Sequence, residues 1–269
     1  MNDNLNKGIF IVGNGPSVTQ IDFRRLPKDV KILRMTNFFF ENRYYAGKRV
    51  DYYIEYFLRL KNQYFNLHHL NERKEYLIDK DNIYVTVAEE PIKYFPLVKL
   101  VTPLIHQNKK IAEFRAFYEN YYSQYLSTGI TAIALAAVLG FKKIYIAGFD
   151  LYSDKDNAHP YKEGDVSSSS MQEIYKTSAP AGEAKKTKVT DVNSVDEILQ
   201  NHPSDVQINF LNLLQSTYGD TEICSVCESS PINAYIKIGP ILFDTPWYLP
   251  ESKPVEAIKD WLPLPNKIN

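Results

Sequence analysis

The sequence predicts an α/β fold built around a parallel sheet, and three features of the chain lead to that prediction. Short apolar runs at Gly8–Val12 and Lys143–Ala147 have the length and residue types of buried strands. Each runs into a glycine turn, at Gly13–Ser17 and at Gly148. A strongly apolar helical stretch, Ile130–Leu139, precedes the second strand. Alternating strand, turn and helix is typical of a Rossmann-like sheet, which binds its ligands at the carboxyl ends of the strands.

The remaining elements follow the same rhythm along the chain. Further strands are predicted at Val30–Met35, Asp51–Tyr56, Ile83–Val87 and Thr221–Val226. Further helices are predicted at Leu58–Arg73, Ile111–Tyr125, Val195–Gln200 and Ile208–Tyr218, with a short one ending near Pro27. Gly140 suits the position just past the helix at 130–139, where a left-handed backbone is common. A chain of 269 residues with no internal repeat fits a single domain, 1–269.

Composition and charge exclude several classes of protein. The formal net charge is −1, whereas a nucleic-acid-binding domain usually presents a basic face, so no nucleic acid partner is expected. The longest mostly apolar run, Ile130–Phe141, is shorter than the ~20 residues of a membrane-spanning helix. Met1–Lys7 is polar and unlike a signal peptide. The apolar stretch Ile236–Leu249 is interpreted as a packed tail, with contact to a membrane surface as the alternative.

Two cysteines, Cys224 and Cys227, stand two residues apart. One such pair makes no disulfide framework, which favours a reducing compartment and a cytoplasmic protein. A structural zinc site would need two further ligands, and no histidine lies within twenty residues on either side. The pair is interpreted as strand cysteines, with a redox pair as the alternative.

The composition changes after Tyr152. Residues 153–194 are rich in Ser, Lys, Asp and Gly and include four consecutive serines at 167–170. No strand pattern is visible there. Two interpretations stay open: a disordered linker, or a flexible lid-like insertion over a binding site, as long loops in compact domains often are.

Gly13–Ser17 is the first candidate ligand site. Its sequence is Gly-Asn-Gly-Pro-Ser, and glycines allow backbone N–H groups to approach a phosphate closely. Val18 stands where the dinucleotide-binding motif has glycine, and the P-loop pattern does not match either. The segment therefore predicts a nucleotide-like ligand other than the common dinucleotides and ATP, with a tight strand-to-helix turn as the alternative.

Hydroxyl groups gather at two further strand or helix ends. Ser127-Thr128-Gly129 opens the apolar helix, where Ser or Thr caps the backbone and the N–H groups also suit an anionic ligand. Tyr152 and Tyr161 follow the strand that ends at Gly148. Phenol groups can donate hydrogen bonds to a leaving phosphate without a metal, and packing of either ring is the alternative.

Five histidines are candidates for a general base, because imidazole titrates near neutral pH. They are His68, His69, His106, His159 and His202. Residue types and spacing alone do not single out one of them.

Two Asp-x-Asp strings offer carboxylate pairs that could hold Mg²⁺ or Mn²⁺ in a nucleotide-sugar transferase. They are Asp79–Asp81 and Asp154–Asp156, of which the second pair is the stronger candidate. Such strings also occur often in polar turns that bind no metal.

Taken in order, these segments resemble the glycosyltransferase family 42 sialyltransferases, bacterial enzymes that sialylate lipooligosaccharide. The matching segments are Ile11–Ser17, Ile21–Pro27, Asn37–Glu41, Tyr44–Lys48, Ser127–Gly129, Leu139–Tyr145, Gly148–Tyr152, the segment around His202 and Cys224–Asn233. The resemblance is dense over 8–56 and 125–152, and thin over 57–124 and 153–194. It implies a single Rossmann-like domain, a GT-A-like variant, with a lid.

The resemblance also implies a reaction and a set of site residues. The reaction is an inverting, metal-independent and cofactor-free transfer of sialic acid from CMP-Neu5Ac to a terminal galactose or sialic acid of a surface glycan. His202 is the implied general base, with Tyr152 and Tyr161 on the leaving phosphate. The implied donor-site residues are Asn14, Gly15, Asn37, Ser127, Thr128, Gly129 and Gly148. A homo-oligomer, often a tetramer in the family, and peripheral contact with the inner membrane are also implied.

Two positions depart from the family's pattern. Tyr125 stands where the family usually has arginine, and Tyr56 stands where a third donor-site asparagine is expected. Loss of a cation and an amide beside an anionic donor weakens donor binding or changes donor choice. Two alternatives follow from these departures: a non-catalytic CMP-sugar-binding protein, and a transferase with a different CMP-nonulosonic acid donor. A third alternative, a metal-dependent transferase, rests on Asp154 and Asp156.

Overall fold

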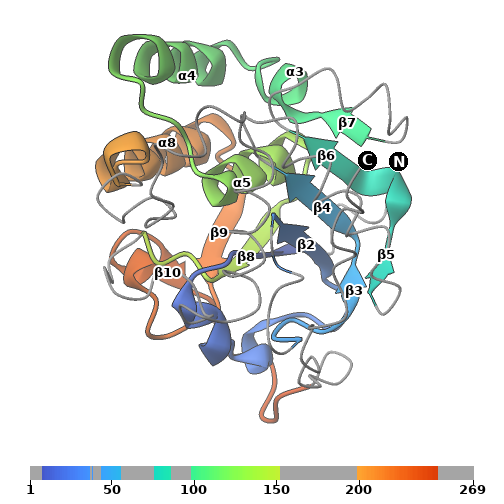
Figure 1. Ribbon diagram of the computed structural model, residues 1–269. Coiled ribbons are helices and arrows are strands. Elements are labelled where there is room, and N and C mark those ends of the chain that lie inside the picture. The colour runs from blue at the N-terminus through green and yellow to red at the C-terminus, as the bar shows by residue number, and fades with distance from the viewer. Residues whose placement is uncertain are drawn as a thin grey trace, which may run out of the picture.

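A parallel sheet forms the centre of the protein. The computed structural model describes residues 8–36, 38, 44–55, 76–85, 98–151 and 199–247. Within these ranges, eight strands form one sheet in the order β10-β9-β8-β1-β2-β4-β6-β7, and every neighbouring pair is parallel (Figure 1). The strands are β1 (Ile9–Val12), β2 (Lys31–Met35), β4 (Tyr52–Glu55), β6 (Ile83–Val85), β7 (Val98–Leu100), β8 (Lys143–Ala147), β9 (Glu222–Ser225) and β10 (Lys237–Ile238). The predicted parallel α/β fold is confirmed.

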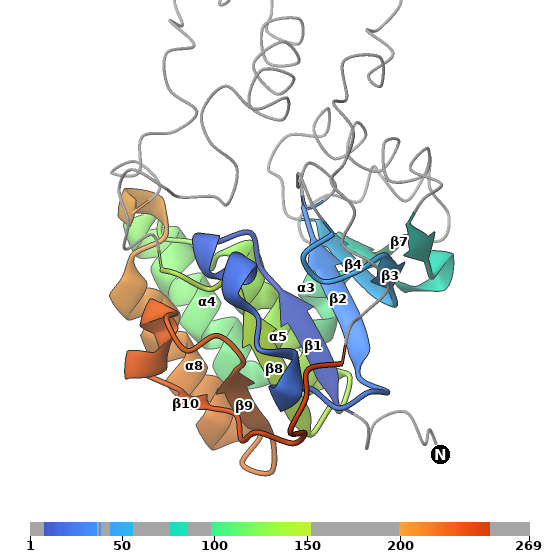
Figure 2. The same ribbon diagram turned by 90° about the horizontal axis from the view of Figure 1, so that it is seen from below.

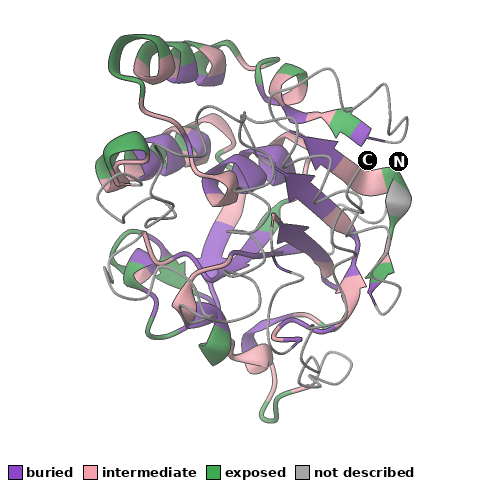
Figure 3. Ribbon diagram, in the orientation of Figure 1, coloured by how far each residue is buried: buried purple, intermediate pink, exposed green. Residues whose placement is uncertain are grey.

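The central strand β1 is buried at every position, which means on both faces of the sheet. Figure 3 shows that the neighbouring strands are largely buried as well. Ile9 and Ile11 belong to the core on the helical face, whereas Phe10 and Val12 belong to the core on the opposite face. Successive side chains of a strand point to opposite faces, so a strand covered on both sides must be apolar at every position. This requirement explains the unbroken run Ile-Phe-Ile-Val.

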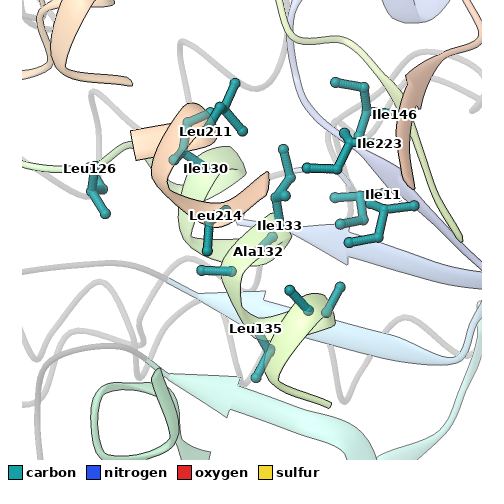
Figure 4. Packing of buried hydrophobic residues seen from close by; sticks show 14 of the residues in the cluster. Ile11, Leu126, Ile130, Ala132, Ile133, Leu135, Ile146, Leu211, Leu214 and Ile223 are labelled. Atoms are coloured by element: carbon teal, nitrogen blue, oxygen red, sulfur yellow. The ribbon is translucent and has the colours of Figure 1, made fainter. Parts of the chain in front are cut away.

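Helix α5 (Thr128–Val138) is the main cover of one face of the sheet. It packs on β1, β2, β4 and β8, and residues 130–137 are all buried. Figure 4 shows Ile130, Ile133 and Leu135 of this helix beside side chains of the strands and of α8. Three more helices complete the layer in the described residues: α3 (Val101–Ile105) and α8 (Ser204–Thr217) pack beside α5, and α4 (Lys109–Tyr122) packs against α8. Because neighbours surround α5, its sequence is apolar all round.

The opposite face is covered by short turns of 3-10 helix and by the tail segment that contains Trp247. The turns are η2 (Pro16–Gln20) and η3 (Phe23–Arg25). The indole Nε1–H of Trp247 donates to the Leu26 carbonyl at 2.8 Å, and its ring meets Phe23 edge-on at 6.2 Å between centroids. The predicted packing of the tail is confirmed at Trp247, whereas Ile241 and Leu242 are exposed. No helix in the described ranges combines the length and the apolarity needed to cross a membrane.

The helix ends differ from the predicted ones for local reasons. α5 begins at Thr128, two residues before the predicted start, because Ser127 caps it. α4 ends at Tyr122 and not at Tyr125, because Ser123 takes a left-handed backbone with φ of 52°. Gly140 has φ of 91°, as its predicted place past α5 requires. α8 begins at Ser204, four residues earlier than predicted.

Several short elements were not predicted, and several predicted segments lie outside the part of the chain that the structure describes. The additional elements are β7, β10, α3 and a two-stranded parallel pair formed by β3 (Arg49–Val50) and β5 (Leu77–Ile78). The predicted helix 58–73, most of the predicted helix 195–200 and the lid-like insertion 153–194 lie outside the described residues. Those predictions stay predictions.

Candidate active site

A pocket opens at the carboxyl ends of β1, β2 and β8, beside the first turn of α5. Figure 2 shows β1 between β8 on one side and β2 on the other, with α5 alongside. From β1 the strand order runs outward in both directions, through β2, β4, β6 and β7 on one side and through β8, β9 and β10 on the other. Open α/β sheets bind ligands at such a topological switch point. The pocket therefore lies where the fold itself favours a ligand.

The pocket brings together seven of the ten predicted site residues. They are Asn14, Gly15, Ser127, Thr128, Gly129, Gly148 and His202. The other three, Asn37, Tyr152 and Tyr161, lie outside the described residues, as do Tyr56 and the histidines at 68, 69 and 159. Lining residues that the sequence analysis did not select include Thr36, Asp150, Ser204 and Gln207.

The glycine turn after β1 forms the floor of the pocket. Gly13 N–H donates to the Ala147 carbonyl at 2.8 Å, and Gly15 N–H donates to the Gly148 carbonyl at 3.0 Å. A Cβ atom on Gly13 would lie 2.3 Å from the Gly148 oxygen. Gly148 has φ of 72°, and a Cβ there would lie 2.6 Å from the Gly13 oxygen. The ends of β1 and β8 can approach this closely only because both positions are glycine.

Asp150 fixes the far end of this turn. Its Oδ2 accepts the Ser17 backbone N–H at 2.9 Å, and its Oδ1 accepts the Ser230 hydroxyl at 3.3 Å. A Cβ on Gly15 would lie 2.2 Å from Asp150 Oδ2, so the carboxylate fills the space that a side chain would need. The sequence signal for Asp150 was its place two residues after Gly148, just past the end of a predicted strand.

Asn14 is oriented by the end of the neighbouring strand β2. Its Nδ2 donates to Thr36 Oγ1 at 2.7 Å. Thr36 has an unusual left-handed backbone with φ of 44°, and its carbonyl accepts the buried Tyr53 hydroxyl at 3.0 Å. The same hydroxyl contacts Glu55, and burial followed by the Glu55 charge raises the pKa of Tyr53 well above its usual value. Tyr53 therefore stays protonated and holds the end of β2 in place.

The first turn of α5 also lines the pocket. Ser127 Oγ accepts the Ile130 N–H at 3.4 Å, so the predicted capping role of Ser127 is confirmed. A Cβ on Gly129 would lie 2.6 Å from the Phe149 ring, which explains why a glycine stands in this turn. The backbone N–H groups and the dipole at a helix N-terminus favour an anionic ligand. This wall therefore suits a phosphate or a carboxylate.

His202 lies at the edge of the pocket, two residues before α8. Its Nδ1 lies 2.8 Å from the Tyr125 carbonyl oxygen. A carbonyl can only accept, so Nδ1 carries the proton and Nε2 of the neutral ring is left as the acceptor. Burial lowers the pKa of His202 from its ordinary 6.5, and the hydrogen bond to Tyr125 opposes this shift only in part. The side chain is thus neutral at pH 7 and competent to accept a proton.

The other described histidine, His106, has a different environment. Its Nε2 lies 3.1 Å from the Arg115 guanidinium, which also binds Glu119. Burial and then the Arg115 charge lower its pKa. His106 follows α3 and does not line the pocket. Of these two histidines, only His202 is placed for chemistry.

The Asp79–Asp81 string has a structural role. Asp79 accepts hydrogen bonds from the Asp81 N–H and from the Asn82 side chain, both at 3.0 Å, and so caps the short turn η5 (Lys80–Asn82). In the part of the chain that the structure describes, no three His, Cys, Asp or Glu side chains gather as metal ligands. Asp154 and Asp156 lie outside it.

The two cysteines are buried free thiols. Cys224 belongs to β9, and Cys227 follows two residues after the end of that strand. Burial raises the pKa of Cys224 to about 11 and that of Cys227 to about 12. Both thiols are protonated at neutral pH and are poor nucleophiles, which favours the packing interpretation over the redox pair.

Fold and pocket together define an α/β protein with a pocket at its topological switch point whose lining suits an anionic, nucleotide-like ligand. The chain belongs to the alpha-2,3-sialyltransferase (CST-I) family, whose sequence profile matches residues 7–269. This confirms the resemblance to bacterial sialyltransferases that the motifs indicated.

Solved structures agree with this assignment. The monofunctional alpha-2,3-sialyltransferase Cst-I from Campylobacter jejuni is 25% identical, with a TM-score of 0.75 over 97% of this chain and 90% of that chain. Two single-residue variants of the sialyltransferase CST-II, each in complex with CMP, are 25% and 26% identical, both with a TM-score of 0.71 over 92% of this chain and 91% of theirs. An uncharacterized protein of Haemophilus influenzae is 25% identical over 141 residues, or 52% of each chain. This chain therefore spans about half the length of that curated relative.

Proposed function

We propose that this protein transfers a sialic acid, or a related nonulosonic acid, from a CMP-linked donor to a glycan hydroxyl, with inversion and without a metal ion. The observation that carries the proposal is the neutral His202, whose Nδ1–H is held by the Tyr125 carbonyl at the edge of the pocket. Solved relatives with bound CMP support the donor class.

The proposed reaction is a single displacement. The acceptor hydroxyl oxygen attacks the anomeric carbon of the donor, and the bond between this carbon and the CMP phosphate oxygen breaks. His202 Nε2 takes the hydroxyl proton, while CMP leaves with the bonding electron pair. Attack from the face opposite CMP inverts the anomeric centre. Tyr152 and Tyr161 are proposed to donate hydrogen bonds to the departing phosphate.

The residues that line the pocket support a set of proposed contacts to the donor. Asn14, Gly15 and Gly148 are proposed to contact the nucleotide together with Asn37, while the first turn of α5 from Ser127 to Gly129 faces the charged part of the donor. No cofactor takes part in this scheme. The acceptor is proposed to be a terminal galactose or sialic acid of a surface glycan such as lipooligosaccharide. A homo-oligomer with peripheral contact to the cytoplasmic side of the inner membrane is the proposed setting.

The test is CMP release from CMP-Neu5Ac in the presence of EDTA, with and without lactose. Release that rises with lactose supports the metal-free transferase. Release that EDTA abolishes and Mg²⁺ or Mn²⁺ restores would replace it with the metal-dependent transferase. Measurable CMP binding without release would point to another CMP-nonulosonic acid donor or to a binding protein without catalysis, and a panel of such donors separates these two outcomes.

A further inference from the structure

We infer that Gln207 is a positioning residue that fixes the tautomer of the proposed general base; the inference rests on the role proposed for His202. Gln207 lies in the first turn of α8 and is 2% exposed. Its Oε1 accepts the Ser127 backbone N–H at 2.8 Å, and its Nε2 donates to the Tyr125 carbonyl at 3.0 Å. One buried amide thus joins the cap of α5 to the carbonyl that holds His202.

The direction of this amide follows from its partners. A backbone N–H can only donate and a carbonyl can only accept, so the Gln207 oxygen must face Ser127 and its nitrogen must face Tyr125. The Tyr125 carbonyl also accepts the His202 Nδ1–H at 2.8 Å. Both lone pairs of this oxygen are therefore engaged, one by Gln207 and one by His202. Tyr125 N–H donates to the Asn201 carbonyl at 2.7 Å, which holds the same peptide from its other side.

This arrangement decides which nitrogen of His202 carries the proton. If the Tyr125 carbonyl turns away, Nδ1 loses its fixed acceptor, and the tautomer protonated at Nε2 becomes accessible. That tautomer cannot take a proton from the acceptor hydroxyl through Nε2. Because Gln207 is the second donor to the carbonyl, its amide stabilises the reactive tautomer without touching the substrate's reacting atoms. Ser127 also accepts hydrogen bonds from the Ile130 and Thr131 N–H groups, and these do not involve Gln207.

The decisive variant is Gln207→Met, which keeps the length and bulk of the side chain and removes both hydrogen bonds. We expect kcat to fall by roughly 10- to 100-fold, a part of what general base catalysis contributes. The Kd for CMP should change less than about threefold, because the contacts of Ser127 within α5 remain. Val206→Ala is the matched control: it removes buried atoms from the neighbouring position of α8 and should lower Tm while leaving kcat within about twofold.

Nitrogen-15 NMR of the histidine rings supplies a readout that does not depend on activity. The His202 signal is identified by its loss in His202→Ala. In the wild-type protein it should show the Nδ1–H tautomer, and in Gln207→Met a mixture of tautomers. Gln207→Glu is the second variant, since its carboxylate should raise the pKa of His202 and move the acid limb of the kcat/KM profile to higher pH.

The outcomes separate the inference from the proposed function. An unchanged tautomer and kcat in Gln207→Met, or equal changes in Val206→Ala, overturn the positioning role. If the wild-type protein transfers no sugar, the proposed function fails, yet the NMR comparison still decides whether Gln207 controls the tautomer of His202.

Discussion

His202 combines two properties that a general base needs at neutral pH. Its Nδ1 proton is fixed by the Tyr125 carbonyl, and its lowered pKa keeps the ring neutral. In the proposed mechanism, the remaining nitrogen, Nε2, takes the proton of the acceptor hydroxyl. Burial supplies the pKa shift, and one backbone carbonyl supplies the orientation.

Replacing His202 by alanine should remove turnover while leaving donor binding. We expect His202→Ala to lower kcat by roughly 10²-fold or more, because the acceptor hydroxyl loses its proton acceptor. The Kd for CMP, measured by calorimetry, should stay within about threefold of wild type. His106→Ala is the control and should keep turnover. Wild-type turnover in His202→Ala would remove His202 from the mechanism.

The pH dependence of kcat/KM should report the lowered pKa of His202. Only the neutral imidazole can act as base, so activity is present above the folded-state pKa and falls about tenfold per pH unit below it. Since burial places this pKa below 6.5, the acid limb should begin below pH 6.5. The free energy of unfolding also falls as the pH drops below 6.5, because the His202 imidazole binds a proton more tightly in the unfolded chain than in the folded protein. An inflection above pH 7 would contradict this assignment.

At the residue level, the sequence indicated seven residues that line the pocket, but not the residues that hold them in place. His202 was preferred over four other histidines through the family resemblance, not through spacing. The contacts from Gln207 to Ser127 and Tyr125 join positions 80 and 82 residues apart, so no local sequence pattern predicts them. Thr36 was missed for a similar reason, since its role depends on a left-handed backbone that threonine rarely adopts.

At the scale of elements, the turn after β1 has room only for glycine at positions 13 and 15, because the ends of β1 and β8 lie in contact. Gly15→Ala should weaken CMP binding by about tenfold or more and lower Tm, since the new Cβ would lie 2.2 Å from Asp150 Oδ2. Gly219→Ala is the matched control, because the nearest atom to its Cβ is 4.0 Å away. Equal effects of the two substitutions on CMP affinity would contradict this account of the turn.

Long elements were predicted more reliably than short ones. β1, β2, β8 and α5 appear where the apolar patterns indicated them, because four or more consecutive buried positions leave a mostly apolar run in the sequence. β10 and β3 have two residues each, and α3 has five, so all three are too short to leave such a run in the sequence. Their formation depends on neighbours supplied by the rest of the fold.

At the scale of the whole molecule, the tail ties the two ends of the described chain together. Leu242 N–H donates to the Arg24 carbonyl at 2.8 Å, and Trp247 covers Phe23 and bonds to Leu26. Trp247→Ala should therefore lower the free energy of unfolding by about 2–3 kcal/mol, measured by urea denaturation. Trp247→Phe should restore part of this, because it keeps a ring beside Phe23 but loses the indole hydrogen bond. Exposed Tyr235→Ala serves as the control and should change stability little.

The parallel sheet was predictable from the alternation of strands and helices, whereas its strand order was not. Apolar runs show that β1 and β8 are buried but do not say that they are neighbours across 130 intervening residues, from Gly13 to Lys142. That pairing creates the switch point and hence the pocket. The strand order therefore creates the pocket, whereas a sequence motif can indicate only some of the residues that line it.

The segments that line the pocket are synthesised in the order in which they occur along the chain. The turn at Gly13–Gly15 and Thr36 come first, α5 and β8 follow, and His202 with Gln207 comes last. On the proposed roles, a nascent chain acquires all the described donor-facing walls before it acquires its base. A chain arrested after β8 would lack the proposed base and so the means to transfer the sugar.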